Sequence, residues 1–294
     1  MIVGDQGVKK AGIIAAFLLP SLLPLAAFTL GPMAASFGIS FLDWNLLTSP
    51  DWIGLDNYRE LLGDEDFWAA VRHTFQFLGM YLPLVFVGGL GLALALNKGV
   101  KAIGFFRALY FMPVVTSWVV VALMWKWLLN PRSGMVNTAL GWIGIDGPGW
   151  WTDPSWAMPA VVLASAWKDL GFVMVIFLAG LQAIPEDYYE AALVDGAGWW
   201  ARFRHVTLPL LSPASFFVLT ISLINGFQVF DQVFVMTGGG PAGSTTVVVE
   251  QIYTNAFRYS RMGYAAAMSW VLFLIVITVT ALQFRAQDRW VHYA

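Results

Sequence analysis

Six long stretches of apolar residues alternate with shorter polar segments along the chain. They occupy residues 11–36, 74–97, 104–128, 157–181, 208–236 and 263–284. An α-helix needs ~20 predominantly apolar residues to cross the hydrocarbon core of a bilayer, so each stretch is long enough to span a membrane. No Gly/Ser-rich linker, block of charge or internal repeat divides the sequence. The pattern therefore predicts one all-α, polytopic transmembrane domain over residues 1–294.

The first apolar stretch follows Lys9 and Lys10, as the apolar core of a secretory signal peptide would. Such a core is typically ~7–15 residues long, which is shorter than this stretch. We therefore expect a retained first helix rather than a cleaved leader.

Composition supports a membrane protein and excludes several other classes. Of the 294 residues, 59% are hydrophobic and only 12% are charged, about half the charge density of a soluble domain. A net charge of −2 gives no reason to expect nucleic acid as a partner. The chain has no cysteine, and His73, His205 and His292 do not have the spacing of metal ligands. We therefore expect no catalytic residue, no metal site and no enzyme activity.

Positively charged residues indicate which side of the membrane each loop faces. With the N-terminus inside, the inner segments and span ends hold nine of them: Lys9, Lys10, Lys98, Lys101, Arg107, Arg202, Arg204, Arg285 and Arg289. The outer segments hold six: Arg59, Arg72, Lys126, Arg132, Arg258 and Arg261. Because Lys and Arg are enriched in cytoplasmic loops, this excess predicts that both termini are cytoplasmic.

Residues 182–207 form a polar interruption between the fourth and fifth stretches. Pro185 suits a helix start, because first-turn N–H groups have no partner to lose. Gly196 suits the left-handed conformation that ends many helices. A second short helix is predicted after it, and Pro209 is expected to open the next span. Such a helix, turn and helix serve either as an amphipathic connector or as a surface for another protein, and both interpretations stay open.

The spacing within this loop resembles the signature loop of ABC-importer permeases. The matching residues are Glu190, Ala191, Ala192, Gly196, Val206, Leu208 and Pro209. The stretches at 54–62, 178–197, 237–253 and 264–270 resemble the carbohydrate-importer branch of that family. Two departures are Val206, where the family usually has isoleucine, and His73-Thr74, where many relatives have Asn-Thr.

The resemblance implies the fold of a type I ABC importer transmembrane domain with six transmembrane helices. It implies that residues 182–207 form a coupling loop that docks on a cytoplasmic ATPase. The coupling residues would be Glu190, Ala191, Ala192, Asp195, Gly196, Leu208 and Pro209. The chain itself would need no cofactor, because ATP and Mg²⁺ would be bound by the ATPase partner.

The resemblance also implies partners and a cargo. The expected partners are a second homologous permease subunit, two ATP-binding subunits and an extracytoplasmic solute-binding protein, in the cytoplasmic membrane of a bacterium or archaeon. The implied cargo is a sugar or oligosaccharide, with a polyol phosphate such as glycerol 3-phosphate as the alternative. An autonomous secondary carrier is a further alternative, but such carriers often have two similar halves, and this sequence has none.

Polar residues inside the spans are candidates for a solute pathway. They are Lys168, Asp169, Asn225, Gln228 and Asp231. Lys168 and Asp169 project about 100° apart, so either each has a partner on another helix or the helix breaks at Gly171. The other three recur every third residue, which places them on roughly one side of the fifth span. A purely structural role, hydrogen bonding between helices, stays open for both groups.

Residues 237–245 read TGGGPAGST and invite comparison with a phosphate-binding loop. They lack the Gly-Lys-Ser/Thr of such loops, and the predicted topology places them outside. We expect either a flexible outer loop that meets a solute-delivery protein or a plain re-entrant turn.

Overall fold

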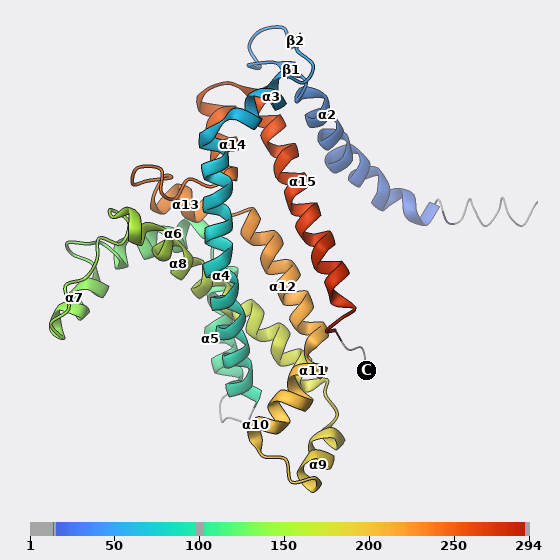
Figure 1. The fold of residues 1–294 in the computed structure, drawn as a ribbon, viewed down its shortest axis with the longest axis vertical. Helices are drawn as coiled ribbons and strands as arrows, with labels where there is room; N and C mark the ends of the chain where they lie inside the picture. The colour runs from blue at the N-terminus through green and yellow to red at the C-terminus, as the bar shows by residue number, and fades with distance from the viewer. Residues whose placement is uncertain (1–13, 15, 98–102, 292–294) are drawn as a thin grey trace, which may run out of the picture. The chain divides into compact units, whose positions relative to one another are not determined.

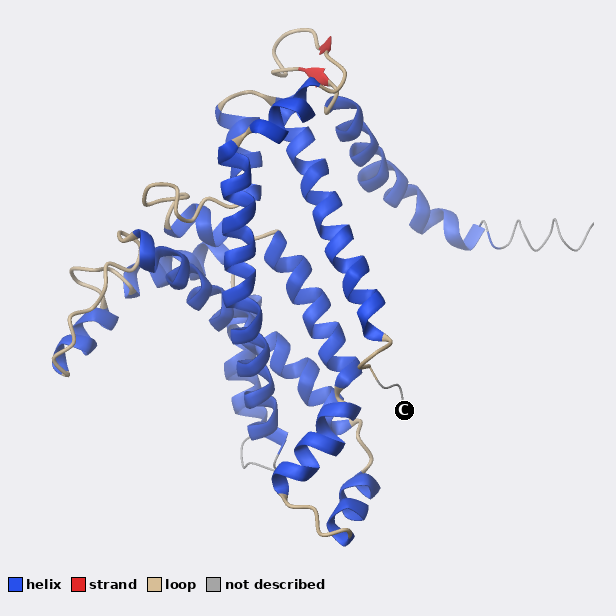
Figure 2. Ribbon diagram, in the orientation of Figure 1, coloured by secondary structure: helices blue, strands red, loops and turns tan. Residues whose placement is uncertain are grey.

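The computed structural model describes residues 14, 16–97 and 103–291, and helices make up most of them (Figures 1 and 2). The chain divides into two compact units, Met1–Asp64 with Ile252–Val271 and Glu65–Gln251 with Leu272–Ala294. Four cations used to predict the orientation, Lys9, Lys10, Lys98 and Lys101, lie outside the described residues.

The first unit combines an apolar helix with a small hairpin. Its elements are η1 (Ala26–Leu30) and α2 (Gly31–Ile39) within a helical run over Ala16–Ile39, β1 (Leu42–Asp43), β2 (Asp51–Trp52), α3 (Asp56–Gly63), η3 (Thr254–Arg258) and the first part of α15 (Met262–Gln287). β1 and β2 pair antiparallel, with Leu42 opposite Trp52. Asn57 Nδ2 donates to the carbonyl oxygens of Ser40 and Leu42 at 2.9 and 3.0 Å, which ties the hairpin to α3.

The side chains of the first helical run are exposed from residue 16 to residue 35. Phe17 and Phe28, for example, are 80% and 82% exposed. An apolar surface of this extent has to be covered in the working protein. The run is apolar enough to be covered by lipid or by the apolar face of another membrane subunit.

The second unit contains most of the remaining helices. They are α4 (Glu65–Asn97), α5 (Ile103–Val115), α6 (Trp118–Leu128), α7 (Met135–Trp142), α8 (Pro154–Gln182), α9 (Glu186–Val194), α10 (Trp199–Arg202), η2 (Phe203–Thr207), α11 (Leu208–Leu210), α12 (Ser212–Phe227), α13 (Asp231–Met236), the start of α14 (Val248–Tyr253) and the second part of α15.

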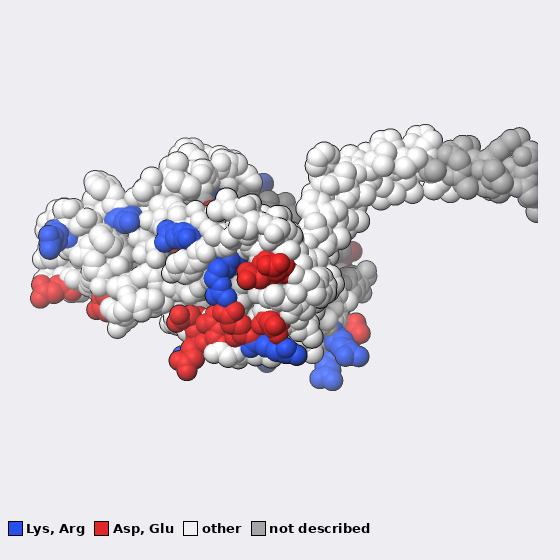
Figure 3. Space-filling model, turned by 90° about the horizontal axis from the view of Figure 1, so that it is seen from above, with Lys and Arg blue, Asp and Glu red and all other residues white. Residues whose placement is uncertain are grey.

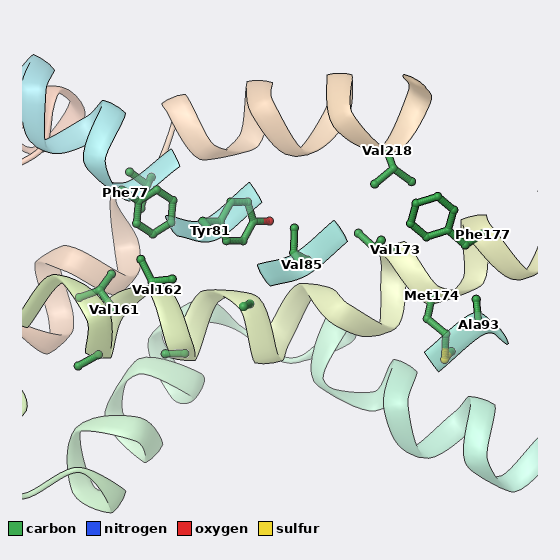
Figure 4. Close-up of a cluster of buried hydrophobic side chains, with 14 of the residues drawn as sticks. Phe77, Tyr81, Val85, Ala93, Val161, Val162, Val173, Met174, Phe177 and Val218 are labelled. Atoms are coloured by element: carbon green, nitrogen blue, oxygen red, sulfur yellow. The ribbon is translucent and has the colours of Figure 1, made fainter. Parts of the chain in front are cut away.

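The core of the second unit lies along the contact between α4 and α8 (Figure 4). Phe77 and Val85 of α4 are buried together with Val161 and Phe177 of α8. A β-carbon at Gly89 would collide with Val173, so the glycine lets the two helices approach closely. Small residues at such interfaces are typical of membrane helices, which associate by close packing rather than by exclusion of water.

Uncharged residues make up most of the face in Figure 3, and acidic and basic groups lie side by side near its lower middle. Two exposed ion pairs of the first unit join Arg59 to Asp56 at 2.7 Å and Arg261 to Glu60 at 2.6 Å. Exposed pairs contribute only about 0–1 kcal/mol each, so they mark a water-facing end more than they stabilise it.

Helices of membrane-spanning length confirm the predicted class of fold. Four single helices qualify, Ala16–Ile39, α4, α8 and α15, and two further pairs qualify when each bent pair counts as one span. The described residues thus provide up to six spans, in agreement with the sequence pattern. Helix ends differ from the apolar limits: α4 begins at Glu65 rather than at residue 74, and the first helix reaches Ile39 rather than residue 36.

The third predicted span, 104–128, is not a straight helix. α5 and α6 meet at a bend of 101°. Pro113 lies near the end of α5, and Ser117 before α6 has an extended backbone with ψ 139°. Proline favours a break because it cannot donate the next helical hydrogen bond. Hydropathy does not detect this bend, because both arms are apolar.

The fifth predicted span, 208–236, is wrong as a continuous helix. The helical run Trp199–Leu210 bends by 63° into α12, next to Pro213, which cannot donate to the carbonyl of Pro209. The side chain of Ser212 accordingly donates to that carbonyl at 2.6 Å. α12 then ends at Phe227, and α13 begins only at Asp231.

Candidate functional site

The predicted helix–turn–helix after the fourth span is present, lowest in the view of Figure 1. α9 begins after Pro185, with Glu186 and Asp187 in its first turn, where the helix dipole favours acidic side chains. It ends as predicted, with Gly196 in the left-handed region at φ +77°.

The end of α9 has the hydrogen bonds of a Schellman motif. The N–H of Ala197 donates to the carbonyl of Ala192 at 2.9 Å, and the N–H of Gly196 donates to the carbonyl of Leu193 at 3.0 Å. These bonds satisfy carbonyls that the helix end would otherwise leave free. The direction in which the chain leaves α9 is therefore fixed by local backbone geometry that strongly favours glycine at residue 196.

Several predicted coupling residues share an exposed surface on α9 and its end. Glu190, Ala191, Asp195 and Gly196 are exposed, and Ala192 is partly exposed. The apolar side chains of Leu193 and Val194 are exposed beside them, by 54% and 88%. These acidic, slim and apolar positions run around the exposed part of α9 and its end, and we call them together the α9 surface.

Leu208 and Pro209 lie elsewhere, half-buried in α11. The prediction that Pro209 opens the next helix is wrong, because the helical run begins at Trp199 and continues through Pro209 to Leu210. The two residues therefore belong to the arm that joins the loop to α12, whereas the α9 surface faces outward.

A hydrogen bond links the two arms of this loop. Tyr189 Oη on α9 and Thr207 Oγ1 at the end of η2 lie 3.1 Å apart, and Thr207 is buried. Tyr189 also packs against the hydrophobic core of the second unit. Tyr189 is thus placed to hold α9 in a fixed position relative to α10 and α11.

Replacing Tyr189 with phenylalanine should loosen this link while keeping the ring in place. A hydrogen bond of this kind contributes ~0.5–1.5 kcal/mol, so we expect a change of a few-fold. The resemblance to ABC-importer permeases then implies that solute transported per ATP hydrolysed falls two- to fivefold in the reconstituted protein, and that Thr207→Val has the same effect. Tyr188→Phe, on the exposed neighbour, is the matched control. Equal stoichiometry in the Tyr189 and Tyr188 variants would remove the link from the mechanism.

Four of the five predicted pathway residues line one cavity of about 280 Å³ in the second unit. They are Asp169, Asn225, Gln228 and Asp231. Asn225 comes from α12 and Asp231 from α13, with Gln228 between these helices. The structure brings them together around a break in the helix, although the sequence predicted one helical face. Irregular backbone at membrane depth is tolerated where it lines such a cavity.

Other residues of the cavity wall were not predicted from the sequence. They are Phe77, Tyr81, Trp118, Ser165, Gly226, Val229, Phe230 and Gln232. Tyr81 Oη donates to Asp169 Oδ2 at 2.7 Å, and Gln232 Nε2 donates to Ser165 Oγ at 3.2 Å. Tyr81 carried a usable signal, because a phenol inside an apolar run needs a polar partner. The others are recognised only once the helices are packed.

The cavity has the chemistry of a site for hydroxyl groups. Carboxylates, amides and a phenol supply donors and acceptors, and the rings of Trp118 and Phe230 supply apolar faces. The residues that line it include no lysine, arginine or histidine. The negative groups of Asp169 and Asp231 disfavour an anionic occupant.

Lys168 does not line this cavity. α8 continues unbroken through Gly171, so the alternative of a helix break there is wrong. Each member of the charged pair instead has a partner on another helix: Asp169 accepts from Tyr81, and Lys168 Nζ donates to the carbonyl of Val114 at 2.8 Å. Lys168 thus belongs to the bend between α5 and α6.

The glycine-rich segment after α13 is held by many hydrogen bonds. Thr245, fully buried, donates through Oγ1 to the carbonyl of Gly240 at 2.7 Å. His73 Nδ1 contacts the carbonyl of Thr246 at 3.1 Å, and Thr74 Oγ1 accepts from the N–H of Val248 at 3.2 Å. The His73-Thr74 pair therefore connects this loop to α4.

Comparisons with known proteins agree with this arrangement. The sequence profile of a family described as "Binding-protein-dependent transport system inner membrane component" matches residues 87–293. The chain is 38% identical to the probable ABC transporter permease protein YesP of Bacillus subtilis, over 95% of this chain and 91% of that protein. It is 35% identical to the trehalose/maltose transport system permease protein MalF of Thermococcus litoralis, over 90% of this chain and 89% of that protein.

A solved structure extends the likeness to three dimensions. It is a bacterial alginate ABC transporter in complex with a periplasmic protein that holds an alginate pentasaccharide. The chain matches it with a TM-score of 0.85 at 26% identity, over 97% of this chain and 96% of that one. The likeness therefore covers nearly the whole of both chains.

The fold and the cavity define a multi-pass helical membrane protein of the transporter class. The chain belongs to the family of binding-protein-dependent transport system inner membrane components, the permeases of ABC importers. Its place is the inner membrane of a prokaryote. It is a transmembrane subunit and not itself an enzyme, and ATP is bound by partner ATPase subunits.

Proposed function

We propose that this permease translocates a sugar or oligosaccharide. The cavity lined by Asp169, Asn225 and Gln228 carries the proposal, because it offers hydrogen-bonding groups beside aromatic faces. Sugars need both, since their hydroxyls require polar partners and their C–H faces pack on rings. Relatives named for trehalose/maltose and lactose transport support the same cargo.

A polyol phosphate is the alternative cargo. It is supported by a relative named for sn-glycerol-3-phosphate transport, which is 36% identical to this chain. The charge of the cavity argues against it. Phosphate sites are usually lined by arginine, lysine or backbone N–H groups. Here the charged groups of the wall are the carboxylates of Asp169 and Asp231, which favour a neutral solute.

The loop between α8 and α12 is the coupling loop in this proposal. With both termini cytoplasmic, the α9 surface faces the cytoplasm and docks on an ATP-binding subunit. Two such subunits move together when ATP binds, and α9 passes this motion through α10 and α11 to α12. A second homologous permease and an extracytoplasmic solute-binding protein complete the importer, within which residues 1–294 act as one transmembrane domain.

Reconstitution tests this function directly. The permease, its partner subunits and the solute-binding protein are placed in proteoliposomes, and uptake of labelled solute is followed with and without ATP. The solute comes from a thermal-shift screen of the binding protein against neutral oligosaccharides and polyol phosphates. We expect neutral oligosaccharides to stabilise the binding protein, and uptake to require both that protein and ATP.

Two other outcomes would redirect the assignment. Stabilisation by polyol phosphates alone would establish the alternative cargo. Uptake driven by an ion gradient without ATP would make the protein a secondary carrier and overturn the role of the coupling loop.

A further inference from the structure

Lys168 is a buried cation whose surroundings the proposed function does not explain. Its residue is only 5% exposed, near the middle of α8. A charged group in a membrane helix is costly unless it has polar partners, and most such groups are functional. Its hydrogen-bond partners, the carbonyl groups of Pro113 and Val114, lie at the bend between α5 and α6.

At the end of α5 the regular pattern of helical hydrogen bonds changes, and the carbonyl of Pro113 accepts from the N–H of Thr116 at 3.1 Å instead of from the residue four positions on. The bend of 101° after Val115 interrupts the helical ladder at this point. Lys168 Nζ donates to the carbonyl of Val114 at 2.8 Å and to that of Pro113 at 3.2 Å. The ammonium thus caps the negative end of the α5 dipole, where a cation is favoured.

The same ammonium reaches the first residue of the next helix. Lys168 Nζ lies 5.0 Å from the centre of the Trp118 ring, within the range of a cation–π interaction. Trp118 lines the proposed solute cavity. One side chain therefore holds both the last turn of α5 and an aromatic wall of the cavity.

Neighbouring contacts make this position rigid. Gly171, one turn further along α8, packs against the carbonyl group of Tyr110 on α5. Asp169, adjacent in sequence, accepts a hydrogen bond from Tyr81 on α4 and lines the cavity beside it. The Lys168-Asp169 pair thus builds two parts of one cavity wall, the carboxylate directly and the ammonium through Trp118.

We propose that Lys168 is a positioning residue for solute recognition, which sets the bend between α5 and α6 and so fixes the ring of Trp118 in the cavity. The inference rests on the proposed role of that cavity in binding the solute. It goes further by assigning recognition to a residue that does not touch the cavity. An ordinary packing role would predict a change in stability alone.

The test is a separation of KM from maximal rate in reconstituted ATP-driven uptake. Lys168→Met keeps the length of the side chain but removes the charge and the donors. We expect apparent KM for the solute to rise about tenfold, the size of effect that loss of a charged hydrogen bond produces. Maximal rate should change by less than about threefold, and Lys168→Arg should restore most of the affinity because guanidinium keeps both charge and donors.

Lys126 offers a matched control. Its Nζ also donates to a carbonyl, that of Val235 at 3.2 Å, and lies 5.5 Å from the ring of Trp151. Neither Lys126 nor Trp151 lines the cavity. Lys126→Met should therefore leave apparent KM within about twofold of the unchanged protein.

Trp118→Leu separates failure of this inference from failure of the cavity assignment. If it raises KM as Lys168→Met does, and the double variant is no worse than either single one, the two residues act through one contact. If Trp118→Leu raises KM and Lys168→Met does not, the positioning role is wrong and the cavity stands. If both variants, together with Asp169→Asn, leave KM unchanged, the cavity is not the solute site. Should Lys168→Met fail to assemble, Lys168→Gln and Trp118→Leu give the same comparison.

Discussion

Gly171→Ala is expected to weaken the packing of α5 against α8 and to lower the stability of the assembled transporter. A β-carbon at this position would collide with the carbonyl group of Tyr110 and lie 3.1 Å from the Cα atom of Phe111. These are backbone atoms, so no side chain can rotate away and the helices themselves must separate. Overpacking of this kind costs ~1–3 kcal/mol.

The effect should show as heat sensitivity in detergent. After a fixed exposure over a range of temperatures, the amount of permease that still elutes as a single species is measured by size-exclusion chromatography. We expect the midpoint temperature to fall by several degrees for Gly171→Ala and further for Gly171→Leu. Uptake should fall with it, since Asp169 and Lys168 occupy the same turn of α8.

Gly91→Ala is the matched control for this substitution. Gly91 lies in α4, and a β-carbon there would meet no atom within 4 Å. Alanine is the better helix former by about 1 kcal/mol, so this variant should be as stable as the original or slightly more so. Equal midpoints for the Gly171 and Gly91 variants would show that α5 and α8 are not held by close backbone approach.

The helix–turn–helix within residues 182–207 was predictable from sequence because its determinants are local. Pro185 limits where α9 can begin, and Gly196 supplies the positive φ that ends it. Both act within one or two turns of chain. The α9 surface follows from them, because a short helix outside the apolar stretches has to expose its polar residues.

The cavity was only partly predictable because it depends on how distant segments pack. Asp169 and Asn225 stood out as polar groups in apolar runs. Trp118 resembled any aromatic residue of a membrane helix, and only the bend after α5 brings it to the cavity. Gly171 was open to interpretation as a break, yet it is a contact point between helices. A glycine in a membrane helix can mark either a break or a close contact with another helix, and only the packing of neighbouring helices shows which role it has.

The bends explain why hydropathy located the spans but not their shape. Apolar length indicates only how much of the chain can lie in lipid. The residues of α5 and α6 are together long enough to span, whether the helix is straight or bent. The break after Phe227 likewise lies inside an apolar stretch. Asn225, Gln228 and Asp231 come together at the cavity because the chain turns between α12 and α13, whereas a regular helix would spread these residues along its length.

Gly196→Asp is expected to uncouple ATP hydrolysis from transport. At φ +77° a residue with a β-carbon is strained by ~1–2 kcal/mol, while a β-carbon here would meet no atom within 4 Å. The penalty is therefore purely one of backbone conformation, and it shifts the end of α9 rather than the fold. A strain of this size changes the population of the native turn roughly five- to thirtyfold. Uptake should fall about tenfold while ATPase activity in the same proteoliposomes persists.

The chain provides two controls that isolate backbone strain from charge. Gly198→Asp adds the same carboxylate two residues away, where φ is −69° and a β-carbon has open space, so coupling should remain near normal. Asparagine and aspartate both enter the left-handed region more readily than most residues, so both variants should retain more transport than Gly196→Val, whose β-branched side chain tolerates that region poorly. The expected order of transport per ATP, from highest to lowest, is therefore glycine, then asparagine and aspartate, then valine. Normal uptake by assembled Gly196→Val transporter would mean that the geometry at the end of α9 does not transmit the motion, and the coupling role would then pass to other contacts of the loop, with Tyr189 the first to examine.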